Sequence, residues 1–144
     1  MNEAERVGLL IKKIHDAVGA IANIELKALN LTISQSHVLH YLYQVRGRKT
    51  PIKEIEHHFC IKHATAIGIV NRLEDKGFVA SFGSNDDKRI RHIEITRKGE
   101  RIHEAIVSEY ASLEEKYLAG LTPEEAGQLK RMLTVINDTL QELR

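Results

Sequence analysis

The sequence of 144 residues is poor in several features that would each define a class of protein. It has one Cys, which excludes a disulfide framework, and it has no Trp, two Pro and only 5% aromatic residues. Its apolar runs are far shorter than the roughly 18 residues that a membrane span needs, and its first residues lack the basic flank and apolar centre of a signal peptide. We therefore expect a cytoplasmic protein without membrane contact, folded as one domain over residues 1–144.

An excess of charge of one sign is also missing, since 21 Lys and Arg oppose 20 Asp and Glu and the net charge is +1. That sum alone argues against a nucleic-acid partner. The charges are nevertheless unevenly distributed, because residues 46–101 hold 13 basic and 8 acidic side chains, whereas the rest holds 8 basic and 12 acidic ones. A basic middle between acidic flanks indicates two functions on two parts of one fold.

Apolar spacing and capping residues predict the helices. Helical periodicity covers residues 5–29, and Thr32 with Gln35 forms a capping-box pattern that begins a second helix. We expect Thr50 to cap a third helix that has Pro51 at its first position. Thr96 is placed to begin a helix after the middle region, and Thr122 begins the last one.

The middle of the chain predicts a helix-turn-helix followed by a β-hairpin. The third helix ends near Phe59, and a new apolar face then begins at Ala66 and ends before Gly77, which suits the left-handed position past a helix end. Two β-prone segments, residues 78–82 and 91–95, flank the turn-forming residues 83–87. The predicted fold class is therefore mainly α with a small β-hairpin.

A cluster of basic side chains in this region indicates DNA binding. The second helix of such a motif can enter the major groove, and a hairpin tip can enter the minor groove, where inserted Arg is favoured. Arg72 and Asn71 are the candidates for hydrogen bonds to guanine and adenine, and Asp87 is expected to orient Arg89 by a charge-assisted pair. The residues expected to contact DNA are Lys62, His63, Thr65, Asn71, Arg72, Lys88, Arg89 and Arg91.

Taken together, these segments resemble the MarR family of winged-helix transcriptional regulators. The resemblance rests on Leu31-Thr32-Ile33-Ser34-Gln35, on Leu73-Glu74-Asp75-Lys76-Gly77-Phe78-Val79, and on Asp87-Lys88-Arg89 leading to Ile95-Thr96-Arg97-Lys98-Gly99. It implies a winged helix-turn-helix over residues 31–99, flanked by dimerisation helices at 1–30 and 100–144. It also implies a homodimer on a pseudo-palindromic operator in double-stranded DNA, acting as a repressor of nearby genes.

The last helix carries a heptad seam that the resemblance assigns to the dimer interface. Its members are Leu129, Leu133, Ile136, Leu140 and Leu143. The resemblance further implies release from DNA by a small molecule, often phenolic, and the residues that could line its crevice are His15, His37, His40 and Tyr41. Ser81 stands where members of the family commonly have an Arg. We therefore expect DNA binding to depend mainly on the hairpin of residues 78–95, called the wing, on Arg72 and on phosphate contacts, with a steep salt dependence.

Alternative functions stay open at this point. A homodimeric protein-interaction module without sequence-specific DNA binding would use the same seam, and a thiol sensor would use Cys60, although a buried, inert Cys60 is the commoner outcome. Eight His residues suggest a metal sensor, but they lack the spacing of a zinc site. The absence of phosphate-loop and hydrolase motifs argues against an enzyme, and no cofactor is expected.

Overall fold

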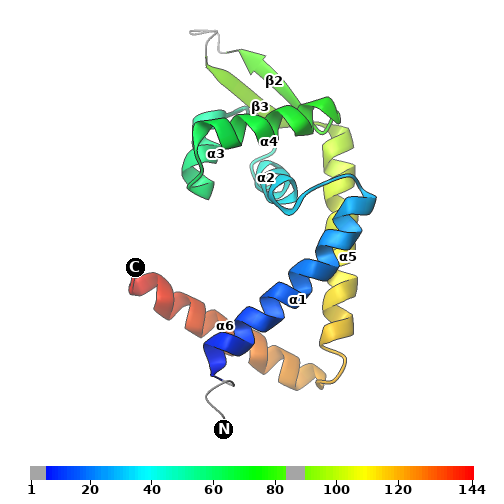
Figure 1. Ribbon diagram of the computed structural model, residues 1–144, viewed down its shortest axis with the longest axis vertical. Helices are drawn as coiled ribbons and strands as arrows, with labels where there is room; N and C mark the ends of the chain where they lie inside the picture. The colour runs from blue at the N-terminus through cyan, green and yellow to red at the C-terminus, as the bar shows by residue number, and fades with distance from the viewer. Residues whose placement is uncertain (1–5, 84–89) are drawn as a thin grey trace. The chain divides into compact units, whose positions relative to one another are not determined.

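The computed structural model describes residues 6–83 and 90–144. It is mainly helical, and its strands form one small sheet, as the sequence predicts (Figure 1). The elements in chain order are α1 (Val7–Ala28), α2 (Ile33–Gln44), β1 (Thr50–Pro51), α3 (Ile52–Phe59), α4 (His63–Asp75), β2 (Val79–Gly83), β3 (Arg91–Ile95), α5 (Arg97–Tyr117) and α6 (Pro123–Glu142).

The chain divides into two compact units, residues 1–108 and 109–144. The first contains the sheet, α1 to α4 and the beginning of α5, while the second contains the end of α5 and α6. The division does not coincide with the predicted limits at residues 30 and 100, and the role of the flanking helices in dimerisation stays a prediction. Among the described residues, no helix is both long and apolar enough to cross a membrane.

The predicted capping boxes at Thr32 and Thr122 are both present. The Thr32 hydroxyl accepts from the Gln35 amide at 3.1 Å, and the Gln35 side chain accepts from the Thr32 amide at 3.3 Å. The Thr122 and Glu125 pair repeats this reciprocal arrangement at 3.1 and 2.9 Å. Each pair satisfies two amide donors that the helix itself leaves unpaired, so these starts are specified locally.

The predicted role of Thr50 is wrong. Thr50 is fully buried and, with Pro51, forms strand β1 instead of capping a helix. Its backbone pairs with Ile93 and that of Pro51 with His92, while α3 begins after Pro51 without a side-chain cap. Pairing with β3 requires extended backbone at Thr50, and this long-range partner is invisible in the local pattern.

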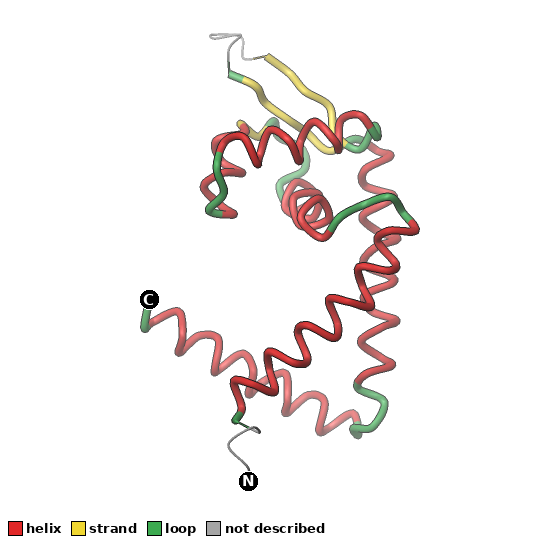
Figure 2. The backbone as a smooth tube through the Cα atoms, viewed as in Figure 1, coloured by secondary structure: helices red, strands yellow, loops and turns green. Residues whose placement is uncertain are grey.

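The sheet joins the predicted hairpin to this additional strand. Its order is β1-β3-β2 and both pairings are antiparallel, with Val79 opposite Ile95 and Gly83 opposite Arg91. Figure 2 shows the two longer strands in yellow running side by side. β3 is therefore the central strand, and Ile93 on it is fully buried.

The helix-turn-helix consists of α3 and α4, and the turn between them begins at Cys60. Cys60 adopts a left-handed conformation with φ of 52° and its side chain is exposed. The expectation of a buried cysteine is therefore wrong, because the position serves to end α3 and points its side chain outward. Gly77 does have the predicted left-handed conformation, with φ of 78°, after α4 ends.

A close backbone approach fixes the beginning of α5. The Thr96 hydroxyl accepts from the Gly99 amide at 3.1 Å and donates to the Gly77 carbonyl at 2.6 Å. A Cβ atom on Gly99 would lie 2.1 Å from the Phe78 carbonyl oxygen. Only glycine fits this contact without a shift of the backbone, so α5 packs tightly on the end of the helix-turn-helix.

The core of the winged helix is aliphatic. Fully buried side chains come from α2, α3, α4 and β3 and include Leu39, Leu42, Ile55, Leu73 and Ile93. By contrast, no residue of α6 is buried. In its predicted seam Leu129 is partly exposed, and Leu133, Ile136, Leu140 and Leu143 are 44%, 39%, 53% and 78% exposed.

Candidate nucleic-acid interface

Helix α4 buries one face and exposes the other, as predicted. Ala66, Ile69, Val70 and Leu73 form its buried face, and Lys62, His63, Thr65, Asn71 and Arg72 are all exposed. Lys62 is the N-cap with an extended backbone, and no side chain among the described residues caps this end. The amide groups of the first turn therefore face outward together with two basic side chains, an arrangement suited to an anion.

Two of the exposed side chains on α4 are held by short-range contacts. His63 Nδ1 lies 2.9 Å from the Glu56 carboxylate on α3, which orients the ring. Arg72 Nη1 donates to the Gly68 carbonyl at 3.3 Å, one turn earlier. A Cβ on Gly68 would lie 3.3 Å from the same nitrogen, so the interior glycine leaves room for Arg72 to lie along its own helix.

A polar network joins α4 to the sheet through Arg91. The Arg91 side chain donates from Nε to the Ser81 hydroxyl at 2.8 Å, from Nη1 to Asn71 Oδ1 at 2.7 Å and from Nη2 to the Glu74 carboxylate. Asn71 and Arg91 were predicted from the sequence as two separate DNA contacts, but in the structure they are hydrogen-bonded to each other. The structure also shows that the Ser81 hydroxyl serves as an acceptor within the protein.

Lys76 anchors the other end of α4 and was missed in the sequence. Its Nζ donates to the Asn30 carbonyl after α1 and, at 2.9 Å, to the buried Gln35 side chain. Burial, followed by repulsion from Arg72, lowers the pKa of Lys76 from its ordinary value. In the sequence, Lys76 and Gly77 predicted the end of the helix but not this contact.

The predicted wing contacts Asp87, Lys88 and Arg89 lie outside the described residues, so their roles stay predictions. The described part of the hairpin adds one contact that the sequence did not suggest. Lys49 Nζ lies 4.4 Å above the centre of the exposed Phe82 ring. This cation–π contact places another basic residue beside β2.

The four residues predicted to line a ligand crevice lie on two helices, His15 on α1 and the others on α2, and their role stays a prediction. His15 and His37 are exposed on α1 and α2, and the His40 ring lies 5.1 Å from that of the buried His103 on α5. Tyr41 borders a hollow of about 490 Å³, whose other lining residues are Lys53, Glu54, His57 and His58. His40 and Tyr41 are adjacent in the helix and so point to different neighbours.

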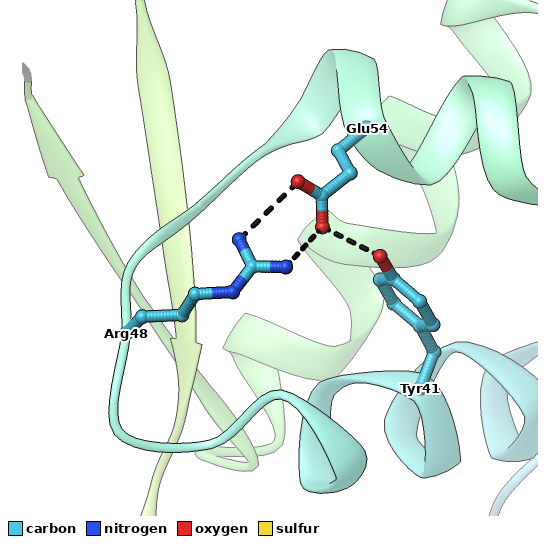
Figure 3. A network of polar contacts seen from close by, with 3 residues as sticks. All are labelled: Tyr41, Arg48 and Glu54. Atoms are coloured by element: carbon cyan, nitrogen blue, oxygen red, sulfur yellow. Dashed lines mark hydrogen bonds and ion pairs between the residues drawn. The ribbon is translucent and has the colours of Figure 1, made fainter.

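Beside this hollow, Glu54 joins Tyr41 to Arg48 (Figure 3). The Tyr41 hydroxyl donates to Glu54 Oε2 at 2.5 Å, and Arg48 donates to both carboxylate oxygens at 3.2 and 2.6 Å. The hydrogen bonds from Arg48 and then Tyr41 lower the pKa of Glu54, and the bond to Glu54 raises the pKa of Tyr41. Three hydrogen bonds hold the Glu54 carboxylate, so the network joins Tyr41 on α2 and Arg48 in the following loop to α3.

In the described part of the chain no three His, Cys, Asp or Glu side chains come close enough together to hold a metal ion. His57 and His58 are adjacent on α3, where the His58 ring stacks on Tyr41 with a centroid distance of 4.2 Å.

Comparison with known proteins identifies the winged helix. Residues 31–90 match the model of the MarR family. The chain is 30% identical over 107 residues to the HTH-type transcriptional regulator Hpr of Bacillus thuringiensis (strain Al Hakam), and equally so to that of Bacillus cereus (strain AH187). Each alignment covers 74% of this chain and 57% of the relative, so the chain spans less than two thirds of their length.

Solved structures show the same fold. The crystal structure of MarR is 24% identical, with a TM-score of 0.83 over 100% of this chain and 97% of that one. MepR of Staphylococcus aureus, a transcription regulator of the multidrug efflux pump MepA, is 24% identical, with a TM-score of 0.81 over 94% and 98%. The S. aureus MepR–DNA complex, also 24% identical, gives 0.74 over 93% and 98%.

Proposed function

The chain belongs to the MarR family, and from this membership we propose that it is a transcriptional regulator that binds double-stranded DNA through its winged helix. The observation that carries the proposal is the outer face of α4. There the first turn has no side-chain cap, and Lys62, Thr65 and Arg72 are exposed while the opposite face is buried in the aliphatic core. Such a helix can lie in the major groove with its N-terminus toward the phosphates. The solved complex of MepR with DNA supports this use of the fold.

In this proposal the regulator acts as a homodimer. The seam on the last helix exposes four large apolar side chains at heptad spacing. A contiguous apolar surface of this kind is typical of a protein–protein interface. Helix α1 independently exposes a second apolar stripe, which consists of Val7, Leu10, Ile11, Ile14, Ile21 and Ile24. A twofold symmetric pair would present two α4 helices to the two halves of a pseudo-palindromic operator.

The finer part of the proposal is repression of nearby genes, relieved by a small molecule, for which a phenolic compound is the first candidate. A ligand that binds only the folded state raises its melting temperature. A panel of phenolic compounds is therefore tested by thermal shift, and each compound that shifts the transition is then added to the DNA-binding assay. Relief requires that the same compound also weakens DNA binding.

The direct test is a binding assay with the promoter DNA beside the protein's own gene. We expect the folded protein to bind at low salt and to lose about 10³-fold or more in affinity between 50 and 200 mM salt, because several phosphate contacts release counterions. A scrambled duplex of the same length and base composition is the matched control. It should bind more weakly and with a similar salt slope.

The competing function, a dimeric protein-interaction module, predicts a different result. A clean dimer by gel filtration with light scattering that binds neither duplex at low salt would contradict the regulator and favour this module. Binding of both duplexes with equal affinity would instead show DNA binding without sequence recognition.

A further inference from the structure

The chemistry of Arg91 fixes the orientation of Asn71. An arginine side chain has only donors, and it stays charged at every physiological pH. The atom of Asn71 that faces Arg91 Nη1 at 2.7 Å must therefore be the carbonyl oxygen, which is how the contact stands. The amide nitrogen of Asn71, with its two N–H groups, consequently points away from Arg91 on an exposed position of α4.

This orientation changes which groups of Asn71 can bind DNA. A bidentate pair with adenine needs the amide oxygen as acceptor for N6 and the amide nitrogen as donor to N7. With its oxygen turned to Arg91, Asn71 offers donors to DNA. Donors match phosphate oxygens and the acceptors on the base edges of the major groove, which are O6 and N7 of guanine, N7 of adenine and O4 of thymine. Guanine is the base that presents two such acceptors side by side.

Arg91 is also a poorer candidate for a DNA contact, because each of its three side-chain nitrogens donates a hydrogen bond within the protein. Nε donates to Ser81 and Nη1 to Asn71, while Nη2 pairs with the Glu74 carboxylate, and the side chain is only 26% exposed. Its charge is already balanced by Glu74. A phosphate would have to compete with that carboxylate, so Arg91 differs from Arg72, whose contact in the described structure is the neutral Gly68 carbonyl.

We propose that Arg91 is a positioning residue that does not contact DNA and that it holds the Asn71 oxygen so that the Asn71 amide nitrogen donates to an acceptor on the duplex. The inference rests on the proposed DNA binding of this same surface. It replaces two independent DNA contacts, that of Asn71 with adenine and that of Arg91 at the hairpin, with one unit made of both residues.

The test uses the full chain and a pool of random duplexes from which bound sequences are selected, followed by affinity measurements on one selected duplex. The variants are Asn71→Ala, Arg91→Met, their combination, and Arg72→Met as the matched arginine control. Circular dichroism and a thermal melt check that each is folded. If Arg91→Met does not fold, Arg91→Lys replaces it, since one ammonium group cannot hold Ser81, Asn71 and Glu74 together.

Because the two residues act as one unit, we expect non-additive losses. Asn71→Ala and Arg91→Met should each weaken binding about tenfold, and the double variant should bind no more weakly than the weaker single variant. Arg91→Met should keep the wild-type salt slope, whereas Arg72→Met should reduce it by about one for each bound subunit. A merely structural role of Arg91 would not produce the non-additivity with Asn71.

The selected sequences separate the two acceptors. Loss of a preference for guanine, for either purine or for thymine at one position of each half-site in Asn71→Ala identifies a base contact, and a uniform loss across sequences identifies a phosphate contact. Loss of a preference for adenine over guanine, additive effects of the two substitutions, or a lower salt slope in Arg91→Met would each overturn the inference while DNA binding stands. Failure of the folded wild type to bind any duplex would overturn both the inference and the proposed function.

Discussion

The winged helix and the last helix of this chain start from similar sequence patterns but differ in what their apolar residues contact. Leu39, Ile55 and Leu73 of the winged helix are fully buried by neighbours from other elements. The α6 seam is as regular in its spacing, yet none of its residues is buried. Periodicity therefore shows which face of a helix is to be covered, but the covering surface has to be found elsewhere.

The largest expected effect comes from placing charge in the seam. Leu133→Glu with Leu140→Glu should convert the proposed dimer to monomer. Each change should cost on the order of 2 kcal/mol or more, because an apolar side chain that the dimer would bury becomes an unpaired charge. Light scattering after gel filtration measures the mass, and the DNA-binding assay should show a parallel loss of affinity.

A matched control for this change is available on the same helix. Thr134→Glu with Gln141→Glu introduces the same charges one position further along, with the same spacing, outside the seam. This variant should keep the wild-type mass. A monomeric wild type, or equal behaviour of the two variants, would show that the seam is not the dimer interface.

Replacing one glycine by alanine in each region should have a smaller effect on the free energy of unfolding, with opposite signs in the two regions. Gly99→Ala places a Cβ against the Phe78 carbonyl and should lower the free energy of unfolding by about 1–3 kcal/mol through overpacking. Gly127→Ala in α6 meets no atom within 4 Å and should raise it by about 0.5–1 kcal/mol, since alanine loses less conformational entropy in a helix. Urea denaturation at one fixed protein concentration measures both, and a tolerated Gly99→Ala would disprove the tight approach.

The smallest effect concerns pH and the buried His103. The His103 ring stacks on Tyr43 with a centroid distance of 4.1 Å. Burial lowers the pKa of His103, and the charges of His40 and Arg46 lower it further, whereas the charge of Glu104 raises it. The unfolded chain therefore binds the proton more readily, so stability is complete above pH 6.5 and falls as the pH drops through the lowered value.

Thermal melts between pH 5 and 8 should show this loss as a few degrees of Tm. His103→Phe keeps an aromatic ring without a titrating group and should flatten the profile. His37→Gln, at an exposed position, should leave it as in the wild type. An unchanged profile in His103→Phe would assign the pH dependence to other groups.

The features that the sequence predicted correctly are those specified by neighbours along the chain. The capping boxes at Thr32 and Thr122, the buried face of α4 and the left-handed Gly77 each depend on residues a few positions apart. Thr50 looked like a cap for the same local reason, but pairing with Ile93 decided its conformation.

The candidate site divides in the same way. Exposure of Lys62, His63, Thr65, Asn71 and Arg72 followed from helical spacing. The joining of Asn71, Glu74 and Ser81 by Arg91 did not follow from spacing, because it depends on the Arg91 side chain of β3 reaching both α4 and β2. The Lys76 contact with the α1–α2 junction likewise joins segments that no local pattern relates.

The two-residue strand β1 has a consequence for how the wing could be moved to another protein. β3 lies between β2, its neighbour in the hairpin, and β1, which pairs residues 50 and 51 with residues 93 and 92. An excised hairpin would leave this side of β3 as an open edge, with unpaired backbone groups free to recruit another chain. A transplant that keeps the wing monomeric must therefore carry the segment from Thr50 onward, so the smallest portable module is the whole helix-turn-helix with its sheet.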